Sequence, residues 1–269
     1  MKLLQLATFG SVLCLCSGAA TAALVSHYTF DETSGTTAAD SGPAGANGII
    51  GSNVTLGTAG VFGTAFTFNN DVGQTGVVDM GNATALFNAI STSQTITLSV
   101  WVKWTTAGPR DSMVFLGDNT ASNRYLDLGT VSATGGFYGR VRDGVNSGFP
   151  DLVPTPTIAL NNGQWHHVAY AMDAVADVTR LYVNGVLVAN TTTPAVTLPS
   201  IFNNFEVGRL GRGAPADAFA GSVDELRIYD TVLTGAEIAA LAVPEPGFSL
   251  LLGFGAAGLI LRRKPGGRR

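Results

Sequence analysis

The chain has 269 residues, of which 46% are hydrophobic and only 13% are charged, with 34 glycines and a formal net charge of −4. This length suffices for one large domain that folds without disulfide staples, and the low charge content argues against a coiled coil and a nucleic-acid binder. Both cysteines, Cys14 and Cys16, lie in the first apolar run. Removal of that run would exclude disulfides, cysteine–zinc sites and cysteine nucleophiles together.

The first 22 residues have the features of a secretory signal peptide. Lys2 precedes an apolar stretch over 3–15, and a run of small residues, 20–22, follows it. The run places alanine at both small-residue positions before a cleavage site between Ala22 and Ala23. We expect the exported chain to begin at Ala23.

Residues 23–242 are predicted to form one β-rich domain. Short apolar runs recur between Gly, Asn, Asp and Pro residues, which is the pattern of an antiparallel sandwich or barrel. The clearest strand is Thr95–Trp104, in which every even-numbered residue is apolar. The other predicted strands are 24–30, 65–68, 76–80, 113–116, 125–128, 137–141, 166–172, 181–183, 186–188, 205–208 and 222–229.

Local signals predict three connections between or after these strands. Asn184-Gly185 lies between two apolar runs and favours a two-residue type I′ hairpin turn. Thr234 and Glu237 have the spacing of a capping box, which predicts a short helix over 236–241, the one helix predicted in this domain. Region 142–163 contains three prolines and is predicted to be a long loop, where binding specificity would reside.

The C-terminal tail, 243–269, has three parts in a fixed order. Pro244-Glu245-Pro246 leads into an uncharged run over 247–261, and the basic cluster Arg262-Arg263-Lys264 follows. As a helix, 15 residues would span about 22 Å, which is short of the ~30 Å hydrocarbon core of a bilayer. We therefore expect a short transmembrane helix that makes transient contact with the inner membrane, with its basic end held in the cytoplasm.

This order resembles the PEP-CTERM sorting tail of exported bacterial proteins. The resemblance implies processing near Pro244, Glu245 and Pro246 by an exosortase-type membrane protease. It also implies delivery to the cell surface or to the extracellular (biofilm) matrix of a bacterium.

Three further segments resemble one family in their order and spacing. They are Gly163-Gln164-Trp165-His166-His167-Val168-Ala169, Arg180-Leu181-Tyr182-Val183-Asn184-Gly185 and Phe219-Ala220-Gly221-Ser222-Val223-Asp224-Glu225-Leu226-Arg227-Ile228-Tyr229-Asp230. Together with 27–32 and 40–42, they are similar to the laminin-G-like branch of the concanavalin A-like lectin/glucanase superfamily. The resemblance implies an all-β fold, a two-sheet antiparallel jelly-roll sandwich, with a concave face that binds glycans in some relatives.

Some relatives of this fold are glycoside hydrolases or polysaccharide lyases, and Asp224 with Glu225 is the candidate pair of catalytic carboxyls in this sequence. Asp224 and Glu225 are adjacent, and adjacent side chains of an extended strand point to opposite faces. A retaining glycosidase needs two carboxyls about 5–5.5 Å apart, so this pair is not expected to act together. The sequence therefore predicts a protein that is not an enzyme, with a carbohydrate-active enzyme on the same fold as the alternative.

A structural calcium ion is the cofactor that the sequence suggests. Ca²⁺ takes six to eight oxygen ligands, and Asp40 and Asn47 lie in a glycine-rich loop that supplies a carboxylate, an amide oxygen and free carbonyls. The family resemblance places the first and last strands side by side, which would bring Asp31 and Asp224 near this loop. The alternative is that Asp40 and Asn47 only cap turns.

The predicted ligand-binding residues are Trp101, Tyr138 and Arg142, because sugar rings stack on aromatic faces and Arg142 borders the long loop. Residues 23–243 carry nine basic and 18 acidic side chains, a charge of −9 that disfavours nucleic acid as a partner. The predicted function is a secreted, surface-sorted, non-catalytic protein that binds extracellular polysaccharide or a matrix protein. A purely structural coat component is a further alternative.

Overall fold

The computed structural model of the chain describes residues 23–69, 75–105, 110–121, 123–131, 134–144, 151–192, 198, 202–213 and 216–244. The predicted signal peptide up to Ala22, Glu245, Pro246 and the apolar run 247–261 lie outside the described residues. Among the residues described, no helix is long and apolar enough to cross a membrane.

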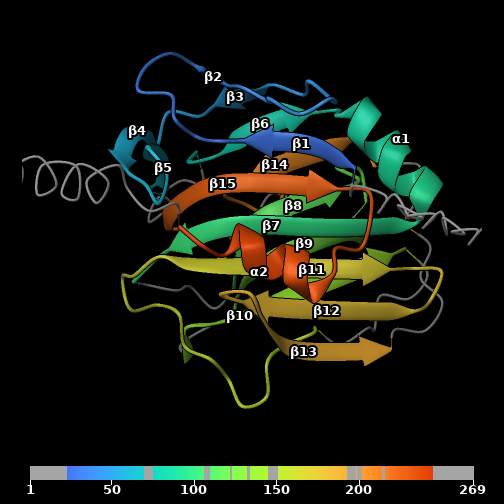
Figure 1. The fold of residues 1–269 in the computed structure, drawn as a ribbon. Coiled ribbons are helices and arrows are strands. Elements are labelled where there is room, and N and C mark those ends of the chain that lie inside the picture. Colours follow the sequence, from blue (N-terminus) through green and yellow to red (C-terminus); the bar gives the residue numbers. More distant parts are fainter. Residues whose placement is uncertain are drawn as a thin grey trace, which may run out of the picture.

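Two antiparallel sheets stack face to face, as Figure 1 shows. The eight-stranded sheet has the order β13-β12-β11-β7-β15-β5-β4, and β1 also pairs with β15. Its strands are β1 (Leu24–Tyr28), β4 (Val54–Ala59), β5 (Thr64–Phe68), β7 (Thr95–Lys103), β11 (His166–Asp173), β12 (Val178–Val183), β13 (Val186–Thr192) and β15 (Gly221–Tyr229). The predicted all-β, two-sheet sandwich is confirmed.

The seven-stranded sheet has the order β10-β9-β8-β14-β6-β3-β2. Its strands are β2 (Thr37–Ala38), β3 (Gly48–Ile50), β6 (Val78–Gly81), β8 (Arg110–Gly117), β9 (Arg124–Val131), β10 (Gly136–Asp143) and β14 (Asn204–Val207). Sequence reasoning did not predict β2 and β3, which have two and three residues, or β4, in which only Val54 and Leu56 are large apolar residues.

The core lies between the sheets and is filled by alternate residues of each strand. In β7 the even-numbered residues from Ile96 to Val102 are fully buried in the core, as the alternation predicts. Trp104, directly after the strand, packs on Phe219 with ring centroids 6.3 Å apart. The odd-numbered residues of β7 therefore face outward from the sandwich.

The described residues form two helices, of which one was predicted. α2 (Gly235–Leu241) lies across the outer face of the eight-stranded sheet (Figure 1), and the Thr234–Glu237 capping box is present. α1 (Thr84–Ser93) was missed, because its N-cap residue Ala83 makes no side-chain cap and its first turn has no acidic residue. It is held instead by the burial of Leu86, Phe87 and Ile90 in the core.

The predicted hairpin turn and the predicted loop are both present. Asn184 and Gly185 have φ angles of 47° and 80°, the left-handed values that a type I′ turn needs. The first two residues of the predicted loop, 142 and 143, instead belong to β10. Its residues 151–163 form no strand of their own, and Leu152 exchanges two backbone hydrogen bonds with Gly139 at the edge of β10. The loop thus returns to the outer edge of the seven-stranded sheet.

Candidate functional site

The outer face of the seven-stranded sheet carries buried polar and charged side chains. In β9, Leu126 and Leu128 belong to the core, so Asp127 between them faces outward. In β10 the same alternation turns Tyr138 and Arg140 outward. Asp127 and Arg140 are direct cross-strand partners, so the two strands bring these side chains together.

Asp127 is the centre of a hydrogen-bond network on this face. Ser112 Oγ donates to its Oδ1 over 2.5 Å, and the Tyr138 hydroxyl donates to its Oδ2. Burial raises the pKa of Asp127 to about 7, although both hydrogen bonds favour the ionised form. Asp127 therefore takes up a proton near neutral pH. Its carboxyl group holds Ser112 and Tyr138 in place from inside and is not a free carboxylate on the surface.

Asp151, which lies in the predicted loop, collects three guanidinium groups. Arg140 Nε and one of its amino groups donate to the two carboxylate oxygens over 2.6 and 3.0 Å, a bidentate geometry. Arg110 also pairs with Asp151, and Arg142 approaches it to 3.6 Å. The guanidinium carbons of Arg140 and Arg110 lie 4.6 and 5.1 Å from the Tyr138 ring centroid.

The members of this network differ in how far solvent reaches them. The side chain of Arg140 is 5% exposed, whereas that of Arg110 is 40% exposed. Arg142 and Asp151 lie between these limits. The face thus presents guanidinium donors and a carboxylate acceptor at its rim, fixed from below by buried groups, which suits hydrogen bonding to the hydroxyls of a sugar.

The outer face of the eight-stranded sheet is different. Three outward residues, Asp224, Trp101 and His167, are direct neighbours across β15, β7 and β11. All three are buried, and each has one polar side-chain atom with no hydrogen-bond partner among the described residues: Asp224 Oδ1, Trp101 Nε1 and His167 Nδ1. The Trp101 ring lies 5.5 Å from that of His167 and 6.5 Å from that of Phe62.

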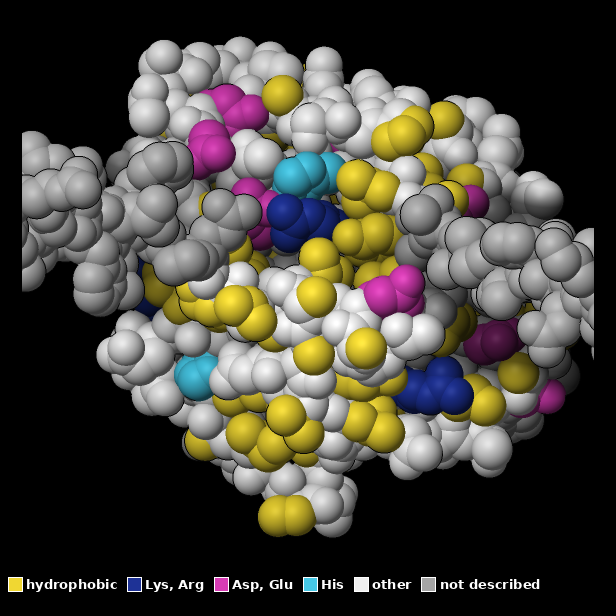
Figure 2. Space-filling model, in the orientation of Figure 1, with side chains coloured by type: hydrophobic (Ala, Val, Ile, Leu, Met, Phe, Trp, Pro, Cys, Tyr) yellow, Lys and Arg dark blue, Asp and Glu magenta, His cyan; other side chains and the backbone are white. Residues whose placement is uncertain are grey.

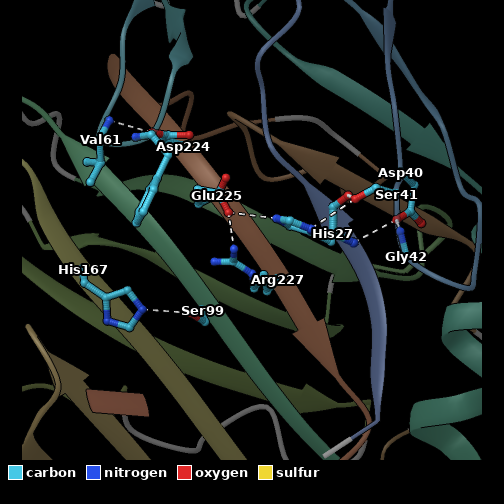
Figure 3. Close-up of polar contacts among 11 residues, drawn as sticks. His27, Asp40, Ser41, Gly42, Val61, Ser99, His167, Asp224, Glu225 and Arg227 are labelled. Carbon is cyan, nitrogen blue, oxygen red and sulfur yellow. Dashed lines mark hydrogen bonds and ion pairs between the residues drawn. The ribbon is translucent and has the colours of Figure 1, made fainter. Parts of the chain in front are cut away.

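Asp224, Trp101 and His167 form a row across the three strands. In Asp224 and His167 the second polar side-chain atom is hydrogen-bonded, as Figure 3 shows. Asp224 Oδ2 accepts from the backbone N–H groups of Val61 and Phe62, at 2.7 and 3.1 Å, and His167 Nε2 lies 2.8 Å from Ser99 Oγ. Burial raises the pKa of Asp224 to about 7 and lowers that of His167 to about 4. Both side chains are therefore driven toward their neutral forms.

A β-bulge corrects the prediction that Asp224 and Glu225 point to opposite faces. The pairing of β15 with β7 shifts between Asp224 and Arg227, and Glu225 has a φ of 53°. Both acids consequently face outward. Glu225 Oε2 lies 2.8 Å from His27 Nε2 and 2.5 Å from Arg227, so it is ion-paired while Asp224 is not (Figure 3).

The four residues predicted to bind calcium fall in two places. Asp224 and Asp31 both accept from the β4–β5 turn, Asp31 Oδ1 from the N–H of Thr64 over 2.7 Å. Asp40 instead accepts from the N–H groups of His27, Gly42 and Ala46, and Asn47 Oδ1 accepts from Asp40. No group of three or more His, Cys, Asp or Glu side chains able to hold a metal occurs in the described part of the chain. The four side chains do not fit one shared ion, and calcium binding stays a prediction.

The three residues predicted to bind ligand are divided between the two sheets. Tyr138 and Arg142 share the outer face of the seven-stranded sheet, whereas Trp101 lies on the opposite side of the sandwich. The sequence reasoning missed Asp127, Asp151 and Arg110. The outward alternation of β9 could have identified Asp127, but the return of Asp151 to β10 had no local signal.

Comparison with known families gives two matches. The profile described as "Concanavalin A-like lectin/glucanases superfamily" matches residues 72–239. The profile described as "PEP-CTERM protein-sorting motif" matches residues 242–264.

Two solved structures share the fold. Domain 4 of AbnA, a GH43 extracellular arabinanase from Geobacillus stearothermophilus, in complex with arabinotriose, is 24% identical and has a TM-score of 0.59, over 82% of this chain and 99% of that one. Trypanosoma rangeli sialidase in complex with sialic acid is 18% identical, with a TM-score of 0.60, over 82% of this chain and 32% of that one.

Among curated proteins, a 90-residue segment is 30% identical to a Rattus norvegicus protein named "Sushi, von Willebrand factor type A, EGF and pentraxin domain-containing protein 1". The match spans 31% of this chain and only 2% of the rat protein. The likeness to the two solved structures shows the fold alone.

Proposed function

The chain belongs to the concanavalin A-like lectin/glucanases superfamily and carries a PEP-CTERM sorting motif, and from this premise we propose that it is an exported, surface-sorted protein that binds extracellular polysaccharide without cleaving it. The binding surface is the outer face of the seven-stranded sheet. The AbnA domain of the same fold, whose structure holds arabinotriose, supports a carbohydrate as the ligand.

The network around Asp151 is the observation that carries the proposal. A carboxylate bonded bidentately by a buried arginine is held in one orientation, so a ligand meets prepared donors and acceptors. Arg110 is the exposed member of this network, and Tyr138 beneath it is fixed through Asp127. Tyr138 thus supports the site from below, because its ring is fully buried.

Binding is favoured over cleavage by the placement of the acidic side chains. Asp127 and Asp224 are the carboxyls with strongly raised pKa values, but both are completely buried. Glu225 lies beside Asp224 yet is engaged by His27 and Arg227. A general acid must reach the glycosidic oxygen, and none of these groups is open to a polymer.

The experiment is a glycan array followed by calorimetry on the purified chain. We expect binding to at least one polysaccharide, a loss of at least tenfold in affinity in Arg110→Ala, and no loss in the control Arg180→Ala, which changes an arginine of the eight-stranded sheet. Release of reducing ends or unsaturated products would favour the enzyme instead. Binding to a matrix protein but to no glycan, or to neither, would favour a protein-binding or coat role.

Export and sorting are tested separately. We propose cleavage of the signal peptide between Ala22 and Ala23 and processing of the tail near Pro244, Glu245 and Pro246 by an exosortase-type protease. Mass spectrometry of the cell-surface protein should show an N-terminus at Ala23 and a C-terminus between Val243 and Gly247. An intact Arg269 on most surface molecules would contradict this processing.

A further inference from the structure

The sorting tail leaves the domain at one particular place on its surface. α2 ends at Leu241, and the described chain continues only to Pro244. The tip of the β12–β13 hairpin lies against this end of the helix, since a Cβ on Gly185 would stand 2.8 Å from Ala239 Cα and 3.4 Å from Ala242 Cβ. The hairpin tip and the tail exit are therefore one surface.

Three exposed apolar residues lie at the hairpin tip and at the tail exit. Val186 pairs with the core residue Val183, so it points to the other face of β13 from Leu187. Val186 is 65% exposed, Leu187 46% and Val243 62%, and we call these three residues the tail-exit patch. Leu187 pairs across strands with Tyr182, a member of the apolar cluster beneath α2. β13 has no charged residue, and Figure 2 shows hydrophobic side chains over α2 and the neighbouring strands. Isolated exposed apolar residues are common on proteins, but here two of them follow the hairpin tip that contacts the end of α2, and the third begins the tail.

The length of the tail limits how far this patch can lie from a membrane. Three residues lie between Val243 and Gly247, where the uncharged run begins, and the four residue steps from Val243 to Gly247 span at most about 14 Å. When the run 247–261 enters a bilayer, with the basic cluster beyond it, the tail-exit patch must lie within that distance of it.

We propose that the tail-exit patch rests on the lipid surface while the sorting tail is in the membrane, with Val186, Leu187 and Val243 inserted at the headgroup boundary. This inference rests on the proposed sorting function of the tail. An uncharged apolar surface suits the boundary between headgroups and acyl chains. The polar face of the seven-stranded sheet then lies on the far side of the sandwich, free for a glycan before processing.

The test uses the complete chain with both native cysteines replaced, Cys14→Ser and Cys16→Ser, and a single new cysteine. Leu187→Cys carries an environment-sensitive dye, and Val175→Cys is the matched control. Val175 is 77% exposed and lies in the turn before β12, so the six residues of that strand, about 20 Å, separate it from the hairpin tip. The protein is reconstituted in vesicles of phosphatidylcholine and phosphatidylglycerol that contain a nitroxide-labelled lipid.

We expect at least threefold stronger lipid quenching at position 187 than at position 175. As a measurement without substitutions, amide hydrogen exchange of 186–189 should slow on vesicles while that of 174–177 does not. Equal weak quenching at both positions in vesicle-bound protein would overturn the patch and leave the sorting function intact. Absence of vesicle binding would overturn both. The dye at position 187 could also report an apolar environment without vesicles and show no quenching by lipid. That result would assign the patch to contact with a second copy of the chain and would also overturn the proposal.

Discussion

The two outer faces of the sandwich are built by the same strand alternation, but the carboxyls Asp151 and Asp224 that lie on them have different partners. On the seven-stranded sheet, Asp151 is surrounded by guanidinium groups, and Arg140 holds it bidentately. On the eight-stranded sheet, Asp224 Oδ2 accepts from two backbone N–H groups. Its other oxygen, Oδ1, has no hydrogen-bond partner among the described residues. Asp151 is therefore held by ion pairs, whereas burial raises the pKa of Asp224, which accepts from two backbone N–H groups, as it raises that of Asp127 on the first face.

The largest expected effect tests whether the arginine network supports the seven-stranded face. Arg140→Ala leaves Asp151 and the edge of Tyr138 without their buried guanidinium, and should lower the free energy of unfolding by about 3 kcal/mol. The melting temperature should fall by roughly 6–12 °C. Arg110→Ala removes an exposed partner of the same carboxylate and should cost under about 1 kcal/mol. An equal fall in melting temperature in both variants would contradict the inference that buried Arg140 supports the face while exposed Arg110 does not.

A second prediction concerns calcium on the other side of the molecule. An ion that binds only the folded chain, at free calcium ~100 times Kd, adds about 2.7 kcal/mol and should raise the melting temperature by roughly 5–10 °C. Melting curves with calcium and with chelator measure the rise. Its loss in Asp224→Ala alone would place the ion at the β4–β5 turn, and its loss in Asp40→Ala alone at the Asp40 loop. No rise in the unsubstituted chain would favour turn capping by both residues.

These two places show what sequence reasoning could and could not reach. Periodicity predicted which side of β7 faces the core, and Asn184-Gly185 and the Thr234–Glu237 box predicted a turn and a helix, because each signal lies within a few residues. The bulge at Glu225 could not be predicted, since a left-handed φ at a non-glycine residue has no local sequence mark. The bulge turns Asp224 and Glu225 to the same face. The prediction that strand alternation would separate the two carboxyls is therefore wrong.

The Arg–Asp151 site depends on distant parts of the chain in the same way. Asp151 reaches Arg140 only because the loop returns to the edge of β10 through Leu152. The sequence indicated that this loop was important and identified Arg142, but not the carboxylate that the arginines share. Family resemblance predicted the sandwich and no particular pair of side chains on it.

A third prediction follows from the buried carboxyls of the two faces. Asp127 and Asp224 have a pKa of about 7 in the folded chain against an ordinary value near 3.9, so the folded state binds their protons more tightly. The raised pKa values add to the free energy of unfolding, and this contribution is fully present below pH ~4. It is lost as pH rises toward 7, by up to about 1.4 kcal/mol per pH unit for each proton. His167, with a pKa lowered to about 4, acts in the opposite direction: it lowers stability as pH falls from ~6.5 to ~4.

The pH dependence can be divided by conservative variants. Asp224→Asn keeps an oxygen for the N–H groups of Val61 and Phe62 but cannot ionise, so it should flatten the fall in melting temperature between pH 5 and 7. Asp127→Asn should do the same from the other face. The expected change is roughly 3–6 °C per pH unit where one full proton is involved. An unchanged slope in both variants would contradict the raised pKa values.

The smallest expected effect is that of Trp101→Phe, which is compared with Tyr138→Phe on the other face. Tyr138→Phe removes a donor that Asp127 uses, and leaving that buried acceptor short of a partner should cost about 2 kcal/mol. Trp101→Phe removes an indole N–H that is buried without a partner, so relief of its desolvation opposes the loss of packed ring atoms. The net change should stay within about 1 kcal/mol, measured by denaturant unfolding of both variants side by side. A cost for Trp101→Phe equal to that for Tyr138→Phe would mean that the indole N–H does have a partner in solution. Asp224 and His167, the cross-strand neighbours of Trp101, would then be the first side chains to test as that partner.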